Sequence, residues 1–261
     1  MDSAPSQFIW YELVTTDPGA AARFYGAVLG WSEQDSGLVD QQYRIWMNGA
    51  DAVGGLMALP DEAAARGLRT CWLAYLRVDD VDATVAAITA AGGAVHKPPT
   101  DIEGVGRFAA VGDPQGAAFY VMAPIGAGPS RAFLQGTPGH GGWHELHTTD
   151  WKAALAFYGA LFGWTPSTPF DMGQMGVYQL FAAGGPDIGG MMNSPAAPRP
   201  FWLYYFNVAD ITAARARLEA AGGTVLHGPS PVPGGAWIIQ ARDPQGAMFA
   251  LVGPGPAAAN A

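Results

Sequence analysis

Early in the chain a mainly apolar, strand-like stretch is followed by apolar positions at helical spacing. Residues 8–15 are mainly aromatic, aliphatic and β-branched, and they predict a β-strand. Asp17-Pro18 then supplies an N-cap carboxylate and a proline at the first helical position, so a helix should begin there and end before Gly30. The apolar residues of this helix recur at helical spacing: Ala21, Phe24, Tyr25 and Val28.

The pattern continues with strand-like stretches, a second helix and a hairpin. The strand-like stretches cover residues 43–47, 53–57 and 72–78, and the helix runs from an Asp80 cap to Gly92-Gly93. Asp113-Pro114-Gln115-Gly116 has the residues typical of a type I turn, and it precedes a last strand at 117–122. The order β-α-β-β-β, then α and two strands, corresponds to two βαβββ units.

The whole pattern occurs twice, with the second copy roughly 130 residues after the first. Trp10–Asp17 matches Trp143–Asp150, and Asp113–Ala117 matches Asp243–Ala247. Three further blocks repeat at nearly the same offset: Phe24-Tyr25-Gly26 with Phe157-Tyr158-Gly159, Gly30-Trp31 with Gly163-Trp164, and Ala90–Gly93 with Ala220–Gly223. We therefore interpret the chain as a tandem duplication.

The duplication predicts an α+β fold of tandem βαβββ modules, forming two open, cup-shaped mixed sheets with helices outside. We expect module one at residues 1–124, a Gly/Pro-rich linker at 125–139, module two at 140–254 and a flexible tail at 255–261.

Composition excludes several classes of function. The net charge is −9 and no basic cluster occurs, so neither nucleic acid nor an anionic membrane is an expected partner. No apolar run approaches the length of a membrane span, and the start of the chain lacks the regions of a signal peptide, so we expect a cytoplasmic protein. A single cysteine, Cys71, excludes an intrachain disulfide and a thiolate-cluster metal site.

The order of these motifs resembles the glyoxalase/bleomycin-resistance/extradiol-dioxygenase superfamily, also called the vicinal oxygen chelate superfamily. The doubled opening Trp-x-Glu-Leu-x-Thr-x-Asp further resembles a two-module bacterial branch that carries the provisional label glyoxalase/hydroxylase. The resemblance covers nearly the whole chain. Its motifs, in chain order, are the Asp-Pro or Asp-Trp at the start of the first helix, Phe-Tyr-Gly, Gly-Trp, Val-Asp-Asp-Val, Ala-Gly-Gly and Asp-Pro-Gln-Gly. Such motifs specify a fold better than a reaction.

The resemblance also implies where a divalent metal would be held by His and Glu in metal-dependent members. Three ligand positions can be placed in both copies: Trp10 or Trp143 at the first, Leu73 or Leu203 at the second, and Tyr120 or Ala250 at the third. A fourth position falls near residues 53–55 or 188–190. Because none of these is a ligand residue, we expect the standard metal site to be lost and no cofactor to be needed. This expectation disfavours standard glyoxalase and ring-cleaving dioxygenase chemistry, in which a metal polarises substrate oxygens.

Polar residues on the first strand of each copy are the candidate catalytic groups. Because alternate strand residues share a face, Glu12 lies on the face of Trp10, and Glu145 and His147 lie on that of Trp143. A carboxylate beside an imidazole can act as an acid/base pair. Alternatively, the two groups can be ligands of a divalent metal at a non-standard site. The competing interpretation is that these are structural polar groups with partners in the fold.

Aromatic residues at repeated positions are candidate ligand contacts, although such residues also form cores. They are Trp10, Trp143, Tyr43, Tyr178, Trp72, Trp202 and Tyr120. Arg44 and Arg107 either hold an anionic ligand or form surface salt bridges. Of the remaining histidines, His144 lies on the strand face opposite Glu145, while those expected in solvent-exposed loops or the linker are His96, His140 and His227.

Two functions follow from these residues. The first is a cup that binds a small aromatic or carbonyl compound without a metal, as the bleomycin-resistance branch of the resemblance implies. The alternative is a glyoxalase-type lyase or an oxygenase with Glu145, His147 and Glu12 as its polar centre. In either case the expected partner is a small molecule, and because a duplicated chain can complete its own cups, a monomer suffices and a homodimer is the alternative.

Overall fold

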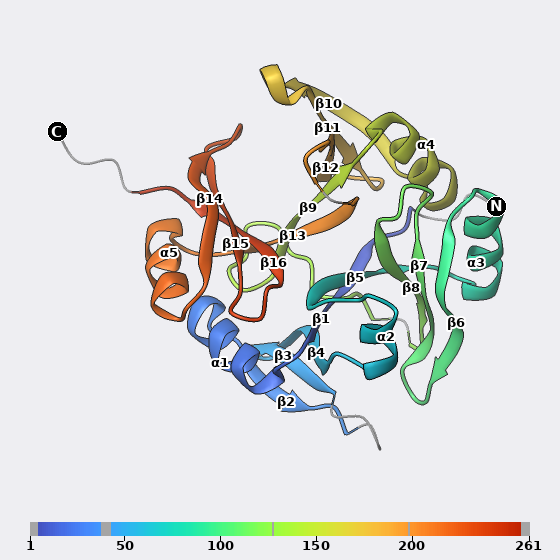
Figure 1. Ribbon diagram of the computed structural model, residues 1–261, viewed down its shortest axis with the longest axis horizontal. Helices are drawn as coiled ribbons and strands as arrows, with labels where there is room; N and C mark the ends of the chain where they lie inside the picture. Colours follow the sequence, from blue (N-terminus) through green and yellow to red (C-terminus); the bar gives the residue numbers. More distant parts are fainter. Residues whose placement is uncertain (1–4, 38–42, 127, 198, 257–261) are drawn as a thin grey trace. The chain divides into compact units, whose positions relative to one another are not determined.

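A computed structural model describes residues 5–37, 43–126, 128–197 and 199–256 (Figure 1). Each copy of the repeat builds one open, eight-stranded sheet, which confirms the predicted α+β fold of tandem modules. Sheet A, from the first copy, has the order β2-β3-β4-β1-β5-β8-β7-β6, and sheet B has the equivalent order β10-β11-β12-β9-β13-β16-β15-β14. Both sheets are mixed, because β1–β4, β5–β8 and their counterparts are parallel and the hairpins are antiparallel.

The strands of sheet A are β1 (Phe8–Thr15), β2 (Ser32–Asp35), β3 (Arg44–Asn48), β4 (Asp51–Ala58), β5 (Cys71–Arg77), β6 (Ala94–Ile102), β7 (Gly106–Gly112) and β8 (Ala118–Pro124). Those of sheet B are β9 (Gly141–Thr148), β10 (Thr165–Asp171), β11 (Val177–Ala182), β12 (Asp187–Asn193), β13 (Phe201–Asn207), β14 (Thr224–Pro231), β15 (Ala236–Arg242) and β16 (Met248–Pro254). The helices are α1 (Pro18–Leu29), α2 (Asp61–Ala65), α3 (Val81–Ala90), α4 (Trp151–Phe162) and α5 (Ile211–Ala220), with a 3-10 turn at Gly173–Met175.

The predicted helix caps are present. Asp17 and Asp80 each accept a hydrogen bond at 2.9 Å from the backbone N–H three residues on. In the second copy Asp150 and Asp210 accept the equivalent bonds at 3.2 Å and 3.0 Å. Gly30 ends α1 in the left-handed conformation, with φ at 77°, where a side chain would be strained. Local sequence signals therefore define both ends of the first helix.

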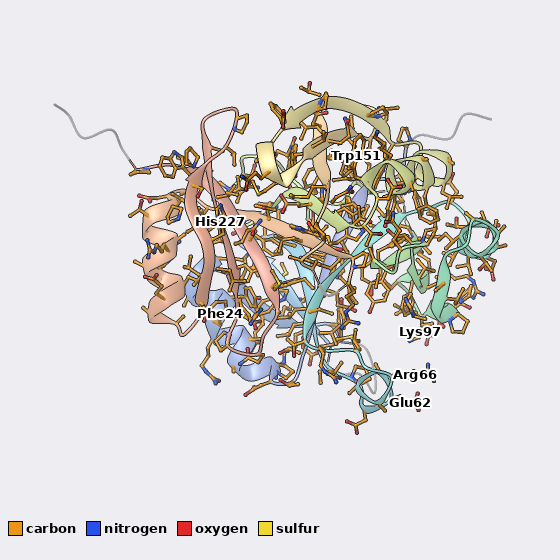
Figure 2. The ribbon with its side chains drawn as sticks, turned by 45° about the horizontal axis from the view of Figure 1, so that its top comes forward. Phe24, Glu62, Arg66, Lys97, Trp151 and His227 are labelled. Atoms are coloured by element: carbon orange, nitrogen blue, oxygen red, sulfur yellow. The ribbon has the colours of Figure 1, made fainter. Side chains whose placement is uncertain are left out.

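The strands that the sequence pattern did not predict are the outermost strands of the two sheets: β2, β6, β10 and β14. These strands are largely exposed, and three of them contain proline, which tolerates only edge positions in a sheet. Two histidines that were expected in loops lie on these edge strands. His96 and His227 are exposed as expected, but they lie on β6 and β14 and not in loops; His227 is marked in Figure 2.

The chain divides into two compact units, and each unit takes residues from both copies of the repeat. The first unit comprises Met1–Ile9, Leu73–Pro129 and His144–Leu203, and the second comprises Trp10–Trp72, Ser130–Trp143 and Tyr204–Ala261. In the second unit α1 lies beside α5 (Figure 1), and Phe24 of α1 (Figure 2) packs edge-on against Phe249 of β16. Helix and strand segments from different copies thus share one hydrophobic core.

A buried tyrosine joins the two copies inside each unit. In the first unit the Tyr158 hydroxyl donates to Asp113 at 3.2 Å and accepts from the Trp202 indole N–H at 3.1 Å. In the second unit Tyr25 has the same pair of partners, Asp243 at 3.1 Å and the Trp72 indole at 2.8 Å. Trp72 and Trp202, which we considered as ligand contacts, therefore lie in the buried aromatic cores.

The aspartate of each Asp-Pro-Gln-Gly turn is also fixed by its own loop. Asp113 Oδ1 accepts from the backbone N–H groups of Gln115 and Ala117, both at 2.9 Å. Gly116 N–H donates to Asp113 O at 3.0 Å, as expected of the predicted type I turn. Burial raises the pKa of Asp113 above its usual value, and the hydrogen bonds oppose this shift. The turn that ends one copy is thus the anchor point for the first helix of the other.

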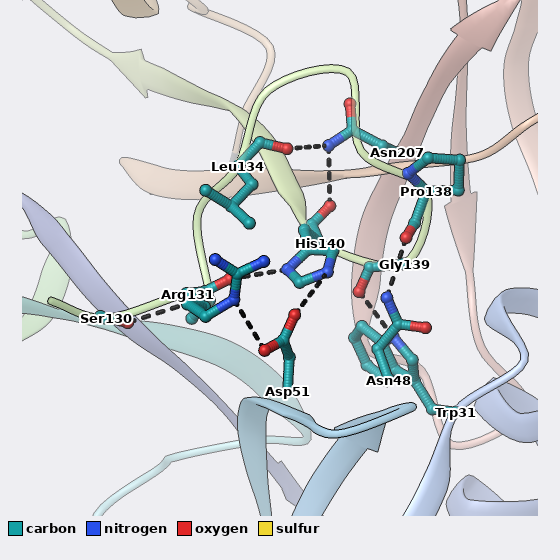
Figure 3. A network of polar contacts seen from close by, with 11 residues as sticks. Trp31, Asn48, Asp51, Ser130, Arg131, Leu134, Pro138, Gly139, His140 and Asn207 are labelled. Atoms are coloured by element: carbon teal, nitrogen blue, oxygen red, sulfur yellow. Dashed lines mark hydrogen bonds and ion pairs between the residues drawn. The ribbon is translucent and has the colours of Figure 1, made fainter.

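The Gly/Pro-rich segment between the copies is fastened to the second unit (Figure 3). Arg131 Nε donates to Asp51 at 2.7 Å, and the Trp31 indole donates to Gly139 O at 2.7 Å. His140, expected in solvent, is only 2% exposed, and its Nδ1 lies 2.6 Å from Arg131 O. The expectation for His140 was wrong because the backbone carbonyl of Arg131 and the carboxylate of Asp51 give the ring polar partners inside the fold.

Replacing either junction tyrosine by phenylalanine should destabilise the fold. Tyr25→Phe and Tyr158→Phe each remove a hydroxyl that serves one buried acceptor and one buried donor, so both partners lose a hydrogen bond. We expect each variant to lose about 2 kcal/mol of unfolding free energy, measured by urea denaturation. Arg44→Gln, which removes an exposed ion pair with Glu33, is the control and should cost less than about 1 kcal/mol. Tyrosine variants as stable as this control would contradict the assignment of the junction.

Candidate functional site

The predicted pair Glu145 and His147 lies together on one face of β9. Glu145 Oε1 and His147 Nε2 are 2.7 Å apart, and the two side chains are only 8% and 14% exposed. On its other side His147 Nδ1 lies 2.7 Å from Ser194 Oγ, just beyond the end of β12. The imidazole also stacks on Phe201 with a ring-centre distance of 4.6 Å and an interplanar angle of 5°. Strand, hydroxyl and aromatic ring together fix the orientation of His147.

Tyr178 reaches the same face because β12 carries a pair of glycines. Gly190 is the register partner of Glu145, and a Cβ added at Gly190 would overlap the Tyr178 ring. A Cβ at Gly189 would instead overlap the backbone oxygen of His144 on the neighbouring strand. One glycine therefore allows the strands to approach, and the other allows an aromatic ring to lie over the backbone beside Glu145.

The first copy builds a related cluster in the second unit. Glu12 pairs with Gly55 across β1 and β4, and a Cβ at Gly55 would overlap the hydroxyl of Tyr43. The Trp10 indole donates to the Tyr43 hydroxyl at 2.9 Å, and Tyr43 hydrogen-bonds Glu12. Burial and the negative charge of Glu12 raise the pKa of Tyr43, so its hydroxyl stays protonated. Here a phenol occupies the role that an imidazole has beside Glu145.

The remaining predicted contacts are dispersed. Tyr120 stacks on Tyr75 with ring centres 4.4 Å apart, and Phe108 packs edge-on beside it with Lys97 over its ring at 4.8 Å. Trp143 is half-buried on β9.

The two arginines lie in exposed ion pairs, in agreement with the salt-bridge interpretation. Arg44 Nη1 is 2.7 Å from Glu33, and Arg107 contacts Asp82 at 2.6 Å and Asp101 at 2.9 Å. The two carboxylates raise the pKa of Arg107 still further above its already high value. The guanidinium groups of Arg44 and Arg107 are thus already paired with protein carboxylates at the surface.

Ser194, the third member of the His147 cluster, was not predicted from the sequence. Ser194 follows β12, and its N–H donates to Thr148 O at 2.8 Å, as Leu59 N–H does to Thr15 O in the first copy. Aligning the two copies through their Gly-Gly pairs places Ser194 opposite Leu59, and aligning their first strands through Trp10 and Trp143 places His147 opposite Val14. The polar replacement of an apolar residue at equivalent positions was the available signal.

The metal positions implied by the family resemblance do not fit a metal in this structure. Leu203 and Ala250 are fully buried apolar side chains, and Leu73 is nearly so. Across residues 5–37, 43–126, 128–197 and 199–256, no group of three or more His, Cys, Asp or Glu side chains is placed to hold an ion. Glu145 and His147 offer two ligand side chains, one fewer than the three protein ligands of a catalytic zinc site.

The family model described as Glyoxalase/Bleomycin resistance protein/Dioxygenase superfamily matches residues 7–121 and 142–251. The chain belongs to this superfamily, as its repeat and its paired sheets indicate. "Putative glyoxylase CFP32" of Mycobacterium bovis is 35% identical over 253 residues, which are 95% of this chain and 94% of that protein. "Anthracycline biosynthesis protein DauV" of Streptomyces sp. strain C5 is 30% identical, with the same two coverages of 95% and 94%.

Solved structures show the same fold at lower identity. The Mn(II)-bound glyoxalase from Novosphingobium aromaticivorans has a TM-score of 0.69 and 18% identity, covering 98% of this chain and 89% of that one. The 2,3-dioxygenase LapB from Pseudomonas sp. KL28 has a TM-score of 0.67 and 14% identity, covering 98% and 94%. Among the described helices, none has the length and apolar character needed to cross a membrane.

His144, between Trp143 and Glu145, should make stability depend on pH. It is fully buried, stacks on Phe8 at 3.7 Å, and has Nδ1 2.7 Å from Ile188 O. Burial lowers its pKa from 6.5 to about 3, although the hydrogen bond to Ile188 opposes the shift. As the pH falls from 6.5 towards 3, the unfolded chain takes up a proton that the folded chain does not, so the fold loses about 1.4 kcal/mol per pH unit.

A His144→Gln variant tests this sign, because glutamine can donate to Ile188 O but does not titrate. Urea unfolding of both proteins should show that the stability advantage of the wild type shrinks as the pH is lowered through this window. Two stability curves that stay parallel would show that His144 takes up its proton equally well in the folded state.

Proposed function

We propose that this chain binds a small aromatic compound carrying phenol or carbonyl oxygens, on the face of sheet B around Glu145 and His147, without the standard metal site of its superfamily. The observation that carries the proposal is the partly exposed imidazole of His147, which is stacked on Phe201 and hydrogen-bonded to a buried carboxylate. Small-molecule sites usually combine an apolar and aromatic surface with a few fixed polar groups.

The residues of this face suit a planar ligand. Phe201, Tyr178 and Met192 are each half-buried, and Met192 pairs with both His147 and Tyr178 in the sheet register. Planar rings and a thioether give favourable contact with another aromatic ring. The Glu145 carboxylate accepts hydrogen bonds only, so within this face it favours a ligand that offers a hydroxyl donor.

The name of one relative, DauV, is in line with an aromatic ligand. DauV is named for the biosynthesis of anthracyclines, which are polycyclic aromatic compounds with ketone and phenol oxygens. Its match extends over 95% of this chain, so it includes the whole segment around Glu145 and His147. The absence of ligand side chains at Leu203 and Ala250 supports a site that works without the metal of the family.

The alternative function is a glyoxalase-type lyase or an oxygenase with a non-standard acid/base or metal site. The short Glu145–His147 hydrogen bond favours it, because a carboxylate beside an imidazole stabilises the protonated ring and can assist proton transfer. The relative CFP32 bears a glyoxylase name, which is in line with this alternative.

Calorimetric titration with a hydroxyanthraquinone, a planar compound with phenol and carbonyl oxygens, tests the binding proposal. In buffer containing EDTA the wild type should bind it. Gly190→Ala should weaken binding at least about tenfold, or 1.4 kcal/mol, because the new Cβ must displace Tyr178. Gly185→Ala is the matched control on the same hairpin, since a Cβ there meets no atom within 4 Å, and it should bind as the wild type does.

Elemental analysis of protein purified without chelator separates the two functions. The proposal expects no metal above trace amounts. One equivalent of a divalent ion, retained by the wild type and lost in a Glu145→Ala/His147→Ala double variant, would overturn the metal-free site and establish the alternative. Equal binding by Gly190→Ala and Gly185→Ala would show that the ligand does not lie on this face.

A further inference from the structure

The hydrogen bonds around His147 form a directed chain from a buried carboxylate to a hydroxyl group. Because a carboxylate only accepts, the Glu145–His147 bond places the proton on Nε2. Nδ1 of the neutral ring is then the acceptor, so the Ser194 hydroxyl donates to it at 2.7 Å. Glu145 is buried, whereas His147 and Ser194 are both only partly buried. The chain therefore ends, away from the carboxylate, at a partly exposed oxygen that is hydrogen-bonded to a base.

Ser194 is held rigidly at this position. Its N–H donates to Thr148 O at 2.8 Å, and its carbonyl oxygen accepts from Ala197 N–H at 2.9 Å. The preceding Asn193 accepts from Trp151 N–H at 2.8 Å, at the start of α4. The serine is thus fixed between the end of β12, the end of β9 and the first turn of a helix, and its distance from His147 follows from the backbone.

The other copy of the repeat shows that the fold does not need this chain of hydrogen bonds. At the equivalent places the first copy has Glu12, Val14 and Leu59, with the same backbone bond from Leu59 N–H to Thr15 O. Two apolar side chains therefore satisfy the same strand positions there. A polar pair that appears in one copy, beyond what the strands require, points to chemistry at that site.

We propose that Ser194 is a nucleophile that accepts an acyl group from a small aryl ester, with His147 as its general base and Glu145 as a positioning residue. Serine, imidazole and carboxylate with 2.7 Å contacts meet the geometric criterion for an activated hydroxyl. The choice of an aryl ester rests on the aromatic binding face proposed above; the reactivity of Ser194 does not.

The proposed reaction balances with water as the only co-reactant. Ser194 Oγ attacks the acyl carbon while its proton passes to His147 Nδ1, and the adjacent Glu145 carboxylate stabilises the imidazolium. The bond from the acyl carbon to the aryl oxygen breaks, and the phenol leaves with the proton from His147. Water then attacks the acyl-serine, gives a proton to His147 and releases the carboxylic acid, after which the proton returns to Ser194.

The first experiment is covalent labelling of the full chain with diisopropyl fluorophosphate, followed by mass spectrometry of the peptide that contains Ser194. One phosphoryl group on Ser194 is expected. His147→Val introduces the first-copy residue and should slow labelling by at least about 100-fold, the lower end of what a general base contributes. Ser194→Ala should take up no label there, and its thermal melting compared with wild type establishes that it is folded.

The second measurement is the release of nitrophenolate from p-nitrophenyl acetate. Glu145→Gln keeps a hydrogen-bonding side chain but removes the charge, so it should lower the rate of acylation and leave KM nearly unchanged. A change in KM alone would assign Glu145 to binding and contradict its positioning role.

The outcomes distinguish this inference from the binding proposal. A wild type that binds hydroxyanthraquinone but remains unlabelled at Ser194 would overturn the nucleophile and leave the binding face intact. Labelling of Ser194 without hydroxyanthraquinone binding would support the nucleophile and overturn the binding proposal. Label found equally in wild type and in folded His147→Val would show that Ser194 is not activated by the imidazole.

Discussion

A buried tyrosine that serves an aspartate and a tryptophan is the interaction on which each compact unit depends. Tyr158 joins the first helix of the second copy to Asp113 in the last turn of the first copy, and Tyr25 makes the reverse connection to Asp243. Both hydroxyls are buried, so neither can exchange its partners for water, and losing one bond costs the full desolvation of a polar group. The fold of each unit therefore requires both copies, since one copy supplies the tyrosine and the tryptophan and the other supplies the aspartate.

The same strand pairing that builds the sheets also places the candidate site. Glu12 and Glu145 each lie opposite a glycine, and each glycine leaves room for a tyrosine ring beside the carboxylate. Buried carboxylates tolerate such an environment when hydrogen bonds compensate for lost water, as Tyr43 does for Glu12 and His147 does for Glu145. The polar centre is thus a product of the register and of the small size of glycine.

The two copies differ at the two positions that carry the proposed chemistry. The tyrosine junctions, helix caps and glycine pairs are repeated, whereas Val14 and Leu59 correspond to His147 and Ser194. A group that is polar in one copy and apolar in the other is not dictated by the shared fold, because the same backbone is built with either. His147 and Ser194, which occur in one copy, therefore mark the candidate site more specifically than Glu12 and Glu145, which both copies share.

The sequence by itself determined the duplication, the helix caps, the turns and the central strands, because these depend on local periodicity and on residues such as Asp17 and Gly30 with local roles. It did not reveal the edge strands, such as β6 and β14, whose polar and proline-rich residues follow from having a neighbour on one side only. The burial of His140 and the joining of Ser194 to His147 were decided by tertiary structure alone. Both depend on residues distant in sequence, and the polarity of a single residue does not show whether the fold will supply it with a partner.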